Sequence, residues 1–161
     1  MNRVFLLLGS NLGDRFSYLK QAITLISRHI GQVVRQSAVY ETASWGNEQQ
    51  PDYLNQVLEI ETKLSPEDLL SQVLKIEKTM GRIRHEKWGA RIIDIDILFY
   101  DNRIVDESDL IIPHPYLHQR RFTLVPLVEL APDFMHPKLK QPLKELLEAL
   151  TDNLEVRKVI G

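Results

Sequence analysis

The stretch Gly81-Arg-Ile-Arg-His-Glu-Lys-Trp-Gly-Ala-Arg-Ile-Ile-Asp-Ile-Asp-Ile-Leu98 decides how this chain is organised. Its second half, residues 92–98, predicts a β-strand because apolar and acidic residues alternate there. Successive side chains of a strand point to opposite faces. Three isoleucines therefore form one face, and Asp94 and Asp96 share the other. The strand is expected to have a core face and a carboxylate face.

The carboxylate face predicts a metal site. Two side chains on one face of a strand lie roughly 6.5 Å apart, and two negative charges at that distance repel, more strongly in a low-dielectric setting. Mg²⁺ commonly binds one or two carboxylates together with phosphate oxygens. Asp94 and Asp96 therefore favour a magnesium site, although a solvent-facing Asp-x-Asp strand is the alternative from this pattern alone.

The first half of the stretch is basic. Between Arg82 and Arg91 it carries five basic side chains, with Glu86 as its acid. Such cations suit the phosphates of a nucleotide, and a metal ion with arginines forms a clamp on a phosphoryl group in transfer. The two halves together predict a Mg²⁺-dependent enzyme acting on a nucleotide or polyphosphate. This pattern does not separate a kinase from a hydrolase or a nuclease.

Composition bounds the remaining possibilities. The 161 residues, 43% hydrophobic and 26% charged, predict one globular domain spanning 1–161. The net charge of −2 makes the basic segment local, which argues against a nucleic-acid partner. The chain has no cysteine and no run of apolar residues long enough to span a membrane. We expect a soluble, cytoplasmic protein without a membrane partner, with a monomer slightly favoured.

The order of predicted elements outward from this stretch indicates the fold class. Apolar periodicity and capping signals predict strands at 3–8, 32–42, 53–62 and 92–98, and helices at 15–29 and 66–80. The resulting order βαββαβ is typical of a ferredoxin-like α+β sandwich, with an antiparallel sheet and helices packed on it. A C-terminal extension adds helices at 124–130 and 142–150, and the last ten residues give no clear signal.

Three further places carry candidate binding groups, each with an alternative. Tyr53 and Asn55 share one face next to a polar loop at 43–52, which suits a flat polar ligand or an ordinary strand end. Glu77 lies at the edge of an apolar helix face, where it could hold an arginine or a ligand group, or be solvated. His114 and His118 have helical metal spacing, but Pro115 disturbs a helix and no third zinc ligand is evident. A histidine and nearby arginines that meet phosphate is the preferred interpretation.

The run Lys87–Leu98 resembles the signature of hydroxymethyldihydropterin pyrophosphokinases. Further matching segments occur in the family's order from residue 4 to about 132: Gly9–Gly13, Tyr40–Thr42, Gln50–Asn55, Glu77, Gly81–Arg84, Pro113-His114, Arg120 and Phe122-x-Leu-x-Pro-Leu127. The resemblance implies transfer of the pyrophosphoryl group of ATP to the hydroxymethyl of a reduced pterin, giving AMP, in folate synthesis.

The resemblance also implies site residues. Asp94 and Asp96 would bind two Mg²⁺ ions and, with Arg82 and Arg91, form the catalytic group. The ATP-binding residues would be Glu77, Arg82, Arg84, Lys87, Trp88, Arg91, Ile97, His114 and Arg120. The pterin-binding residues would be Thr42, Ala43, Trp45, Tyr53, Asn55 and Phe122.

The sequence departs from the family pattern at a few places, none of which removes a group essential to the reaction. Lys87 stands where arginine is common, so a bidentate contact becomes a point charge. The basic loop is one residue shorter than in some relatives, the segment 43–45 is less proline-rich, and Pro115 stands where an aromatic residue occurs. Two other functions are kept as alternatives: a ferredoxin-like module that senses nucleotide without turnover, and a Mg²⁺-dependent phosphohydrolase.

Overall fold

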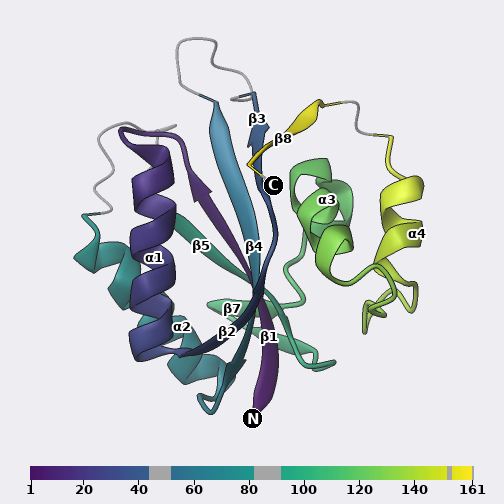
Figure 1. Ribbon diagram of the computed structural model, residues 1–161. Coiled ribbons are helices and arrows are strands. Elements are labelled where there is room, and N and C mark those ends of the chain that lie inside the picture. Colours follow the sequence, from purple (N-terminus) through teal and green to yellow (C-terminus); the bar gives the residue numbers. More distant parts are fainter. Residues whose placement is uncertain (44–51, 82–91, 152–153, 161) are drawn as a thin grey trace.

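In a computed structural model, residues 1–43, 52–81, 92–151 and 154–160 are described. Within these ranges an antiparallel sheet of six strands forms the middle layer (Figure 1). The strands are β1 (Asn2–Ser10), β2 (Gly31–Gln36), β3 (Val39–Thr42), β4 (Tyr53–Thr62), β5 (Asp94–Tyr100) and β8 (Val156–Ile160). Their order is β5-β1-β4-β3-β8, and β2 continues the position of β3 by pairing with the far half of β4.

The order β5-β1-β4-β3 is the strand arrangement of the ferredoxin-like βαββαβ unit, so the expected fold class is confirmed. Helices α1 (Arg15–His29) and α2 (Pro66–Thr79) cover one face of the sheet (Figure 1). Both begin at the expected caps, since Asp14 accepts a hydrogen bond from the Ser17 amide and Ser65 accepts one from the Asp68 amide.

Two apolar cores hold the layers together, one on each face of the sheet. Alternate residues of β1 divide between them: Val4, Leu6 and Leu8 pack toward α1 and α2, whereas Phe5 and Leu7 pack toward the opposite side. On that side lie α3 (Arg121–Leu130) and α4 (Leu143–Glu148). Strands buried on both faces lack a polar face, which is why β4 shows no clean alternation in its sequence.

The second predicted strand, 32–42, is wrong as a single element, because β2 and β3 are separate strands. Between them the Ser37 hydroxyl accepts a hydrogen bond from the Val57 amide, and the Ala38 amide donates to the Glu129 carboxylate of α3. A side chain therefore takes the place of a backbone acceptor, and the ladder is interrupted. Ser37 and Ala38 look strand-compatible in sequence, so only the partners show the break.

Other boundaries differ from the prediction at element ends. Gly9 and Ser10 extend β1 beyond the predicted 3–8, and Phe99 and Tyr100 extend β5 beyond the predicted end at residue 98. Helix α3 begins three residues earlier than expected, and α4 is shorter than expected. The strands β6 (Val105–Glu107) and β7 (Leu110–Ile112) form a short hairpin, and a 3-10 turn follows at Leu117–Gln119.

The C-terminal strand β8 carried no signal in the sequence. It pairs antiparallel with β3 and so covers what would otherwise be a free sheet edge. Its residues Val156–Val159 are half-buried or exposed, and strands without a buried face lack the apolar alternation that marks a strand in sequence. In the described ranges, no helix is long and apolar enough to cross a membrane.

Candidate active site

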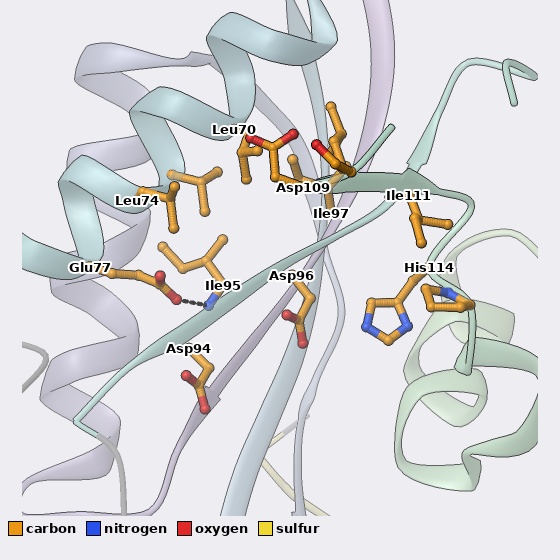
Figure 2. Close-up of a pocket in the computed structure, with 14 residues that line it drawn as sticks. Leu70, Leu74, Glu77, Asp94, Ile95, Asp96, Ile97, Asp109, Ile111 and His114 are labelled. Atoms are coloured by element: carbon orange, nitrogen blue, oxygen red, sulfur yellow. Dashed lines mark hydrogen bonds between the residues drawn. The ribbon is translucent and has the colours of Figure 1, made fainter. Parts of the chain in front are cut away.

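The two strand carboxylates lie on β5, the edge strand next to β1. Asp94 pairs with Gly9 and Asp96 with Leu7, and both carboxylates are half-buried. Figure 2 shows them pointing the same way from the strand. Ile95 and Ile97 are 5% and 7% exposed in the core beneath α1 and α2. The expected division of this strand into a core face and a carboxylate face is confirmed.

Glu77 holds β5 in place from the last turns of α2. Its Oε2 accepts a hydrogen bond of 2.8 Å from the Ile95 amide, and its side chain is buried (Figure 2). The solvated-edge alternative is therefore wrong. A hydrogen bond to a charged acceptor is stronger than a neutral one, so this contact fixes the strand from which the aspartates project.

A cavity of about 430 Å³ opens between α2, β5 and the β6–β7 hairpin. Apolar side chains of α2, β5 and β7 form one part of its wall, and carboxylates and an imidazole form the rest. Its lining residues are Leu70, Val73, Leu74, Glu77, Asp94, Ile95, Asp96, Ile97, Ser108, Asp109, Leu110, Ile111, His114 and Pro115. The cavity thus joins an apolar wall to the carboxylate pair, an arrangement that suits a base with a polyphosphate tail.

His114 reaches this cavity from the segment after β7. Its backbone amide donates to the Leu98 carbonyl at 3.1 Å, which ties the segment to β5. Its Nδ1 accepts a hydrogen bond of 3.2 Å from the Tyr116 amide. Burial, together with the nearby Arg120 guanidinium, lowers the pKa of His114 to about 4. His114 is therefore neutral at physiological pH with its proton on Nε2, a donor for an anionic ligand.

Arg120 precedes α3 and lies between two aromatic rings. Its guanidinium carbon is 5.3 Å from the ring centre of Tyr116 and 5.6 Å from that of Phe122. The structure thus brings Arg120 and His114 together, as the sequence analysis expected. The described residues contain no group of three or more His, Cys, Asp or Glu side chains that could hold a metal ion.

A second polar group lies two strands away on the same face of the sheet. Asn55 of β4 also pairs with Gly9, from the side opposite Asp94. It is buried, and its Nδ2 donates to the Leu8 carbonyl at 3.3 Å. A Cβ atom on Gly9 would lie 3.0 Å from that Nδ2. Glycine therefore keeps open the space between the amide and the carboxylate.

Two residues expected at the pterin, Tyr53 and Thr42, lie near Asn55 in the sheet. They form the last cross-strand pair between β3 and β4, two pairs away from the Tyr40–Asn55 pair. The Thr42 hydroxyl is buried and has no hydrogen-bond partner among the described residues. Phe122 stands in the first turn of α3, the helix that packs on this face of β4. Ala43 follows β3 and is exposed.

Six expected site residues lie outside the described ranges: Trp45, Arg82, Arg84, Lys87, Trp88 and Arg91. Their roles stay predictions. Two further residues contribute to the site. Gly9 lies beyond the strand predicted at 3–8, whereas in the structure it belongs to β1 and separates the two polar groups inside the sheet. Leu74 lines the cavity although it is 51% exposed, and its place in the apolar pattern of α2 does not distinguish a cavity wall from core.

The fold and the site define a class: a ferredoxin-like sandwich with a nucleotide-sized cavity and a carboxylate pair, and with a buried amide, that of Asn55, in the same cross-strand row. Comparison with known proteins gives the family. Residues 5–132 match the family model of 7,8-dihydro-6-hydroxymethylpterin-pyrophosphokinase (HPPK). The chain therefore belongs to the HPPK family, which confirms the resemblance and the expected enzyme class, a pyrophosphokinase.

Individual relatives agree. The chain is 44% identical over 145 residues to the 2-amino-4-hydroxy-6-hydroxymethyldihydropteridine pyrophosphokinase of Aquifex aeolicus, covering 90% of each chain. It is 40% identical over 157 residues to the enzyme of that name from Bacillus subtilis, covering 97% of this chain and 89% of the relative. A crystal structure of an HPPK-DHPS with substrates has the same fold, with a TM-score of 0.76 at 16% identity, over 92% of this chain and 43% of that one.

Proposed function

We propose that this protein transfers the pyrophosphoryl group of ATP to the hydroxymethyl group of 6-hydroxymethyl-7,8-dihydropterin, giving AMP and the pterin diphosphate. One observation carries the proposal: Asp94 and Asn55 share a cross-strand row with Gly9 between them. Two strand spacings separate them, roughly 10 Å. The face therefore offers a polyphosphate site and a polar pocket at the separation that a pyrophosphoryl donor and a small bicyclic acceptor require.

ATP occupies the cavity along β5 in this proposal. Glu77 receives the Ile95 amide at the outer edge of the strand, and backbone groups of an antiparallel strand point the same way at every second residue. The Ile97 amide and carbonyl therefore face the cavity and can read the edge of a base. Leu70 and Leu74 supply the apolar wall on the α2 side. The neutral His114 donates from Nε2 to a phosphate oxygen.

Magnesium fits the donor set at the other end of the cavity. Asp94 and Asp96 are hard oxygen donors on one face of one strand, and Mg²⁺ typically takes one or two protein carboxylates and completes its shell with phosphates and water. When bound, Mg²⁺ neutralises phosphate charge and lowers the pKa of a hydroxyl next to it. The number of ions, two, follows from the family resemblance.

The pterin lies between β4 and the start of α3. Asn55 hydrogen-bonds its polar edge, the buried Thr42 hydroxyl gains a partner there, and Tyr53 and Phe122 stack on its two faces. Trp45 and Ala43 belong to the segment next to this pocket in the sequence.

Pyrophosphoryl transfer depends on positioning of the substrates and on stabilisation of negative charge more than on a strong base. Asn55 and the two rings place the hydroxymethyl group toward the carboxylate pair. His114 and Arg120 bind negative charge on the polyphosphate, and the cluster Arg82, Arg84, Lys87 and Arg91 remains the predicted source of further positive charge. Excluding water between the two substrates prevents hydrolysis of ATP.

One assay tests the proposal. Purified protein is incubated with Mg²⁺-ATP, with and without 6-hydroxymethyl-7,8-dihydropterin, and the nucleotide products are resolved. AMP that forms only with the pterin supports the proposed reaction. Formation of ADP, or phosphate release without pterin, would instead support the phosphohydrolase, and nucleotide binding without turnover would support the sensing module.

A further inference from the structure

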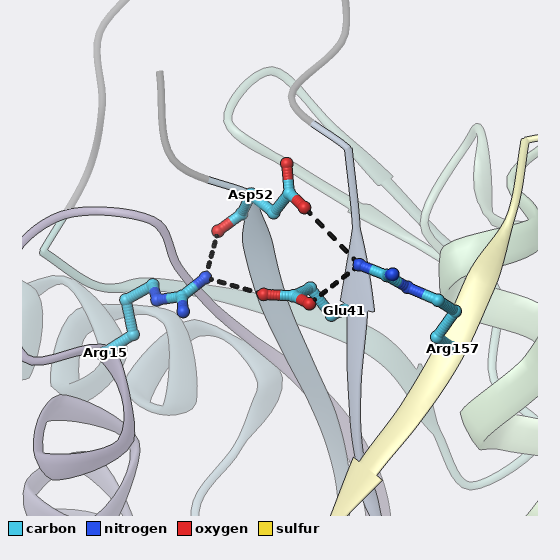
Figure 3. A network of polar contacts seen from close by, with 4 residues as sticks. All are labelled: Arg15, Glu41, Asp52 and Arg157. Atoms are coloured by element: carbon cyan, nitrogen blue, oxygen red, sulfur yellow. Dashed lines mark hydrogen bonds and ion pairs between the residues drawn. The ribbon is translucent and has the colours of Figure 1, made fainter. Parts of the chain in front are cut away.

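Four polar residues form a network on the back of the sheet, behind the pocket assigned to the pterin (Figure 3). The Glu41 carboxylate of β3 lies at its centre. It accepts a hydrogen bond of 3.1 Å from Arg15, at the start of α1, and one of 2.9 Å from Arg157, on β8. Arg15 also donates to the Asp52 carbonyl at 2.7 Å, and Arg157 lies 3.6 Å from the Asp52 carboxylate. The network joins the first helix, the C-terminal strand and the neighbouring ends of β3 and β4.

The network meets the pocket through the backbone. Glu41 is flanked by Tyr40 and Thr42, and side chains alternate along a strand. Tyr40 donates its hydroxyl to Glu129 of α3, so Tyr40 and Thr42 point toward α3, whereas Glu41 points toward α1. Glu41 therefore anchors the backbone next to Thr42 from the opposite face of β3. This contact helps to fix the position of Thr42 at the site assigned to the pterin.

Asp52 has the matching role directly before β4. Its carbonyl is held by Arg15, and the next residue, Tyr53, is the cross-strand partner of Thr42. Thr42–Tyr53 is the last pair of this ladder. The ends of ladders open more easily than their middles. The network therefore lies where the two strands would otherwise separate, at the residues assigned to the second substrate.

We infer that Arg157, on the C-terminal strand, is a positioning residue for the pterin: with Arg15 it fixes Glu41 and thereby the spacing of Thr42 and Tyr53. This inference rests on the function proposed above. Arg157 touches neither substrate. β8 also hydrogen-bonds to β3 at this point, since Arg157 is the register partner of Glu41. Strand β8 thus supports the site of the second substrate through β3, although β8 and β4 lie on opposite sides of β3.

The expected effect is moderate because the network is partly solvated. The Glu41 side chain is 19% exposed and that of Arg157 is 53% exposed. A single exposed ion pair adds little stabilising free energy, whereas a network of several charges around a partly buried carboxylate adds more. We therefore expect Arg157→Ala to raise KM for the pterin roughly three- to ten-fold. A reduced pterin carries no net charge at neutral pH, so loss of a distant positive charge does not by itself weaken its binding.

The experiment measures kcat and both KM values for the wild type, Arg157→Ala, Arg157→Lys and Lys158→Ala. Lys158 is the matched control, an exposed cation on the same strand. We expect Arg157→Ala to raise KM for the pterin selectively, with kcat and KM for ATP within two-fold of wild type. Arg157→Lys should restore part of the loss, because it keeps the charge and loses the fork of donors. Thermal unfolding of each variant tests whether it is folded under assay conditions.

The inference is overturned if Arg157→Ala behaves like Lys158→Ala, or if it raises both KM values equally. If Arg157→Ala fails to fold, the Arg157→Lys and Glu41→Gln variants provide the test. The inference is then overturned if Arg157→Lys is folded and both variants have the wild-type KM for the pterin. The wild-type reaction separates this result from failure of the proposed function. Wild-type enzyme that makes no pterin-dependent AMP contradicts the function itself, whereas an active wild type with an insensitive Arg157 contradicts the positioning role alone.

Discussion

Asp94 and Asn55 lie in one cross-strand row, on opposite sides of Gly9. They come from positions 39 residues apart in the chain, yet two strand spacings separate them in the sheet. The carboxylate stands at the edge strand and the amide in the middle of the sheet. The proposed transfer of a pyrophosphoryl group between two substrates depends on this spacing of the carboxylate and the amide.

Replacing Asp96 by alanine should abolish most activity and leave the fold intact. The half-buried carboxylate pair is the proposed metal donor set, and losing one charge-stabilising group of an active site commonly lowers kcat by on the order of 10²–10³. The fold should persist because removal of one of two like charges relieves repulsion. Pterin-dependent AMP formation and urea denaturation measure the two effects. Asp106→Ala, which removes an exposed acid of β6, is the control; near-normal turnover in Asp96→Ala would refute the metal assignment.

Glu77→Ala should destabilise the protein and weaken ATP binding together. The change leaves the buried Ile95 amide without its acceptor, at a cost of about 1–3 kcal/mol. It also releases β5, so KM for ATP should rise. Glu77→Gln keeps an oxygen acceptor and should retain most of the stability. Denaturant unfolding and ATP titration of both variants give the comparison, and equal stability of the alanine and glutamine variants would show that this hydrogen bond contributes little.

Gly9→Ala should impair the pterin selectively. The added methyl would lie 3.0 Å from Asn55 Nδ2, so the amide has to shift. Overpacking of a buried site typically costs about 1–3 kcal/mol. We expect KM for the pterin to rise roughly ten-fold, equivalent to about 1.4 kcal/mol, with KM for ATP unchanged. A double-mutant cycle with Asn55→Ala identifies the cause. If Gly9→Ala acts through Asn55, it adds little to Asn55→Ala; full additivity would point to another contact.

Stability should fall as the pH drops below about 6.5. His136 is buried, and its Nδ1 accepts hydrogen bonds from the Lys138 and Leu139 amides at 3.1 and 3.0 Å. Burial, with His118 and Lys138 adding to it, lowers the pKa of His136 to about 4. Between about pH 6.5 and 4 the unfolded chain thus binds a proton that the folded chain does not, so the stabilisation present above this window is lost on acidification. By pH 5 the loss from this residue should be about 1–2 kcal/mol.

Urea denaturation at a series of pH values measures this effect. His136→Asn offers an oxygen acceptor in place of Nδ1 without a titrating ring, and it should flatten the pH dependence. The dependence does not vanish, because the pKa of His114 is lowered in the same direction. His29→Asn, at an exposed position, is the control. A pH profile that is unchanged in His136→Asn would contradict the assignment to this residue.

The order of elements and the carboxylate face of β5 were determined by the sequence itself. Helix caps at Asp14 and Ser65 and the alternation at 92–98 are local signals, because they depend on neighbours a few residues away. They were enough for the βαββαβ arrangement and for both aspartates. The family resemblance supplied what local signals could not, the identity of the second substrate.

Tertiary structure decided what depends on partners distant in the chain. Glu77 could have been solvated, and only its approach to the Ile95 amide shows that it holds β5. Gly9 is unremarkable until the sheet places it between Asp94 and Asn55. Strand β8 is exposed at Arg157, Lys158 and Val159 and pairs with β3, and no local pattern in the sequence predicted it. Its Arg157 meets Glu41 across 116 residues of sequence, a contact that register and layer packing determine and that periodicity cannot encode.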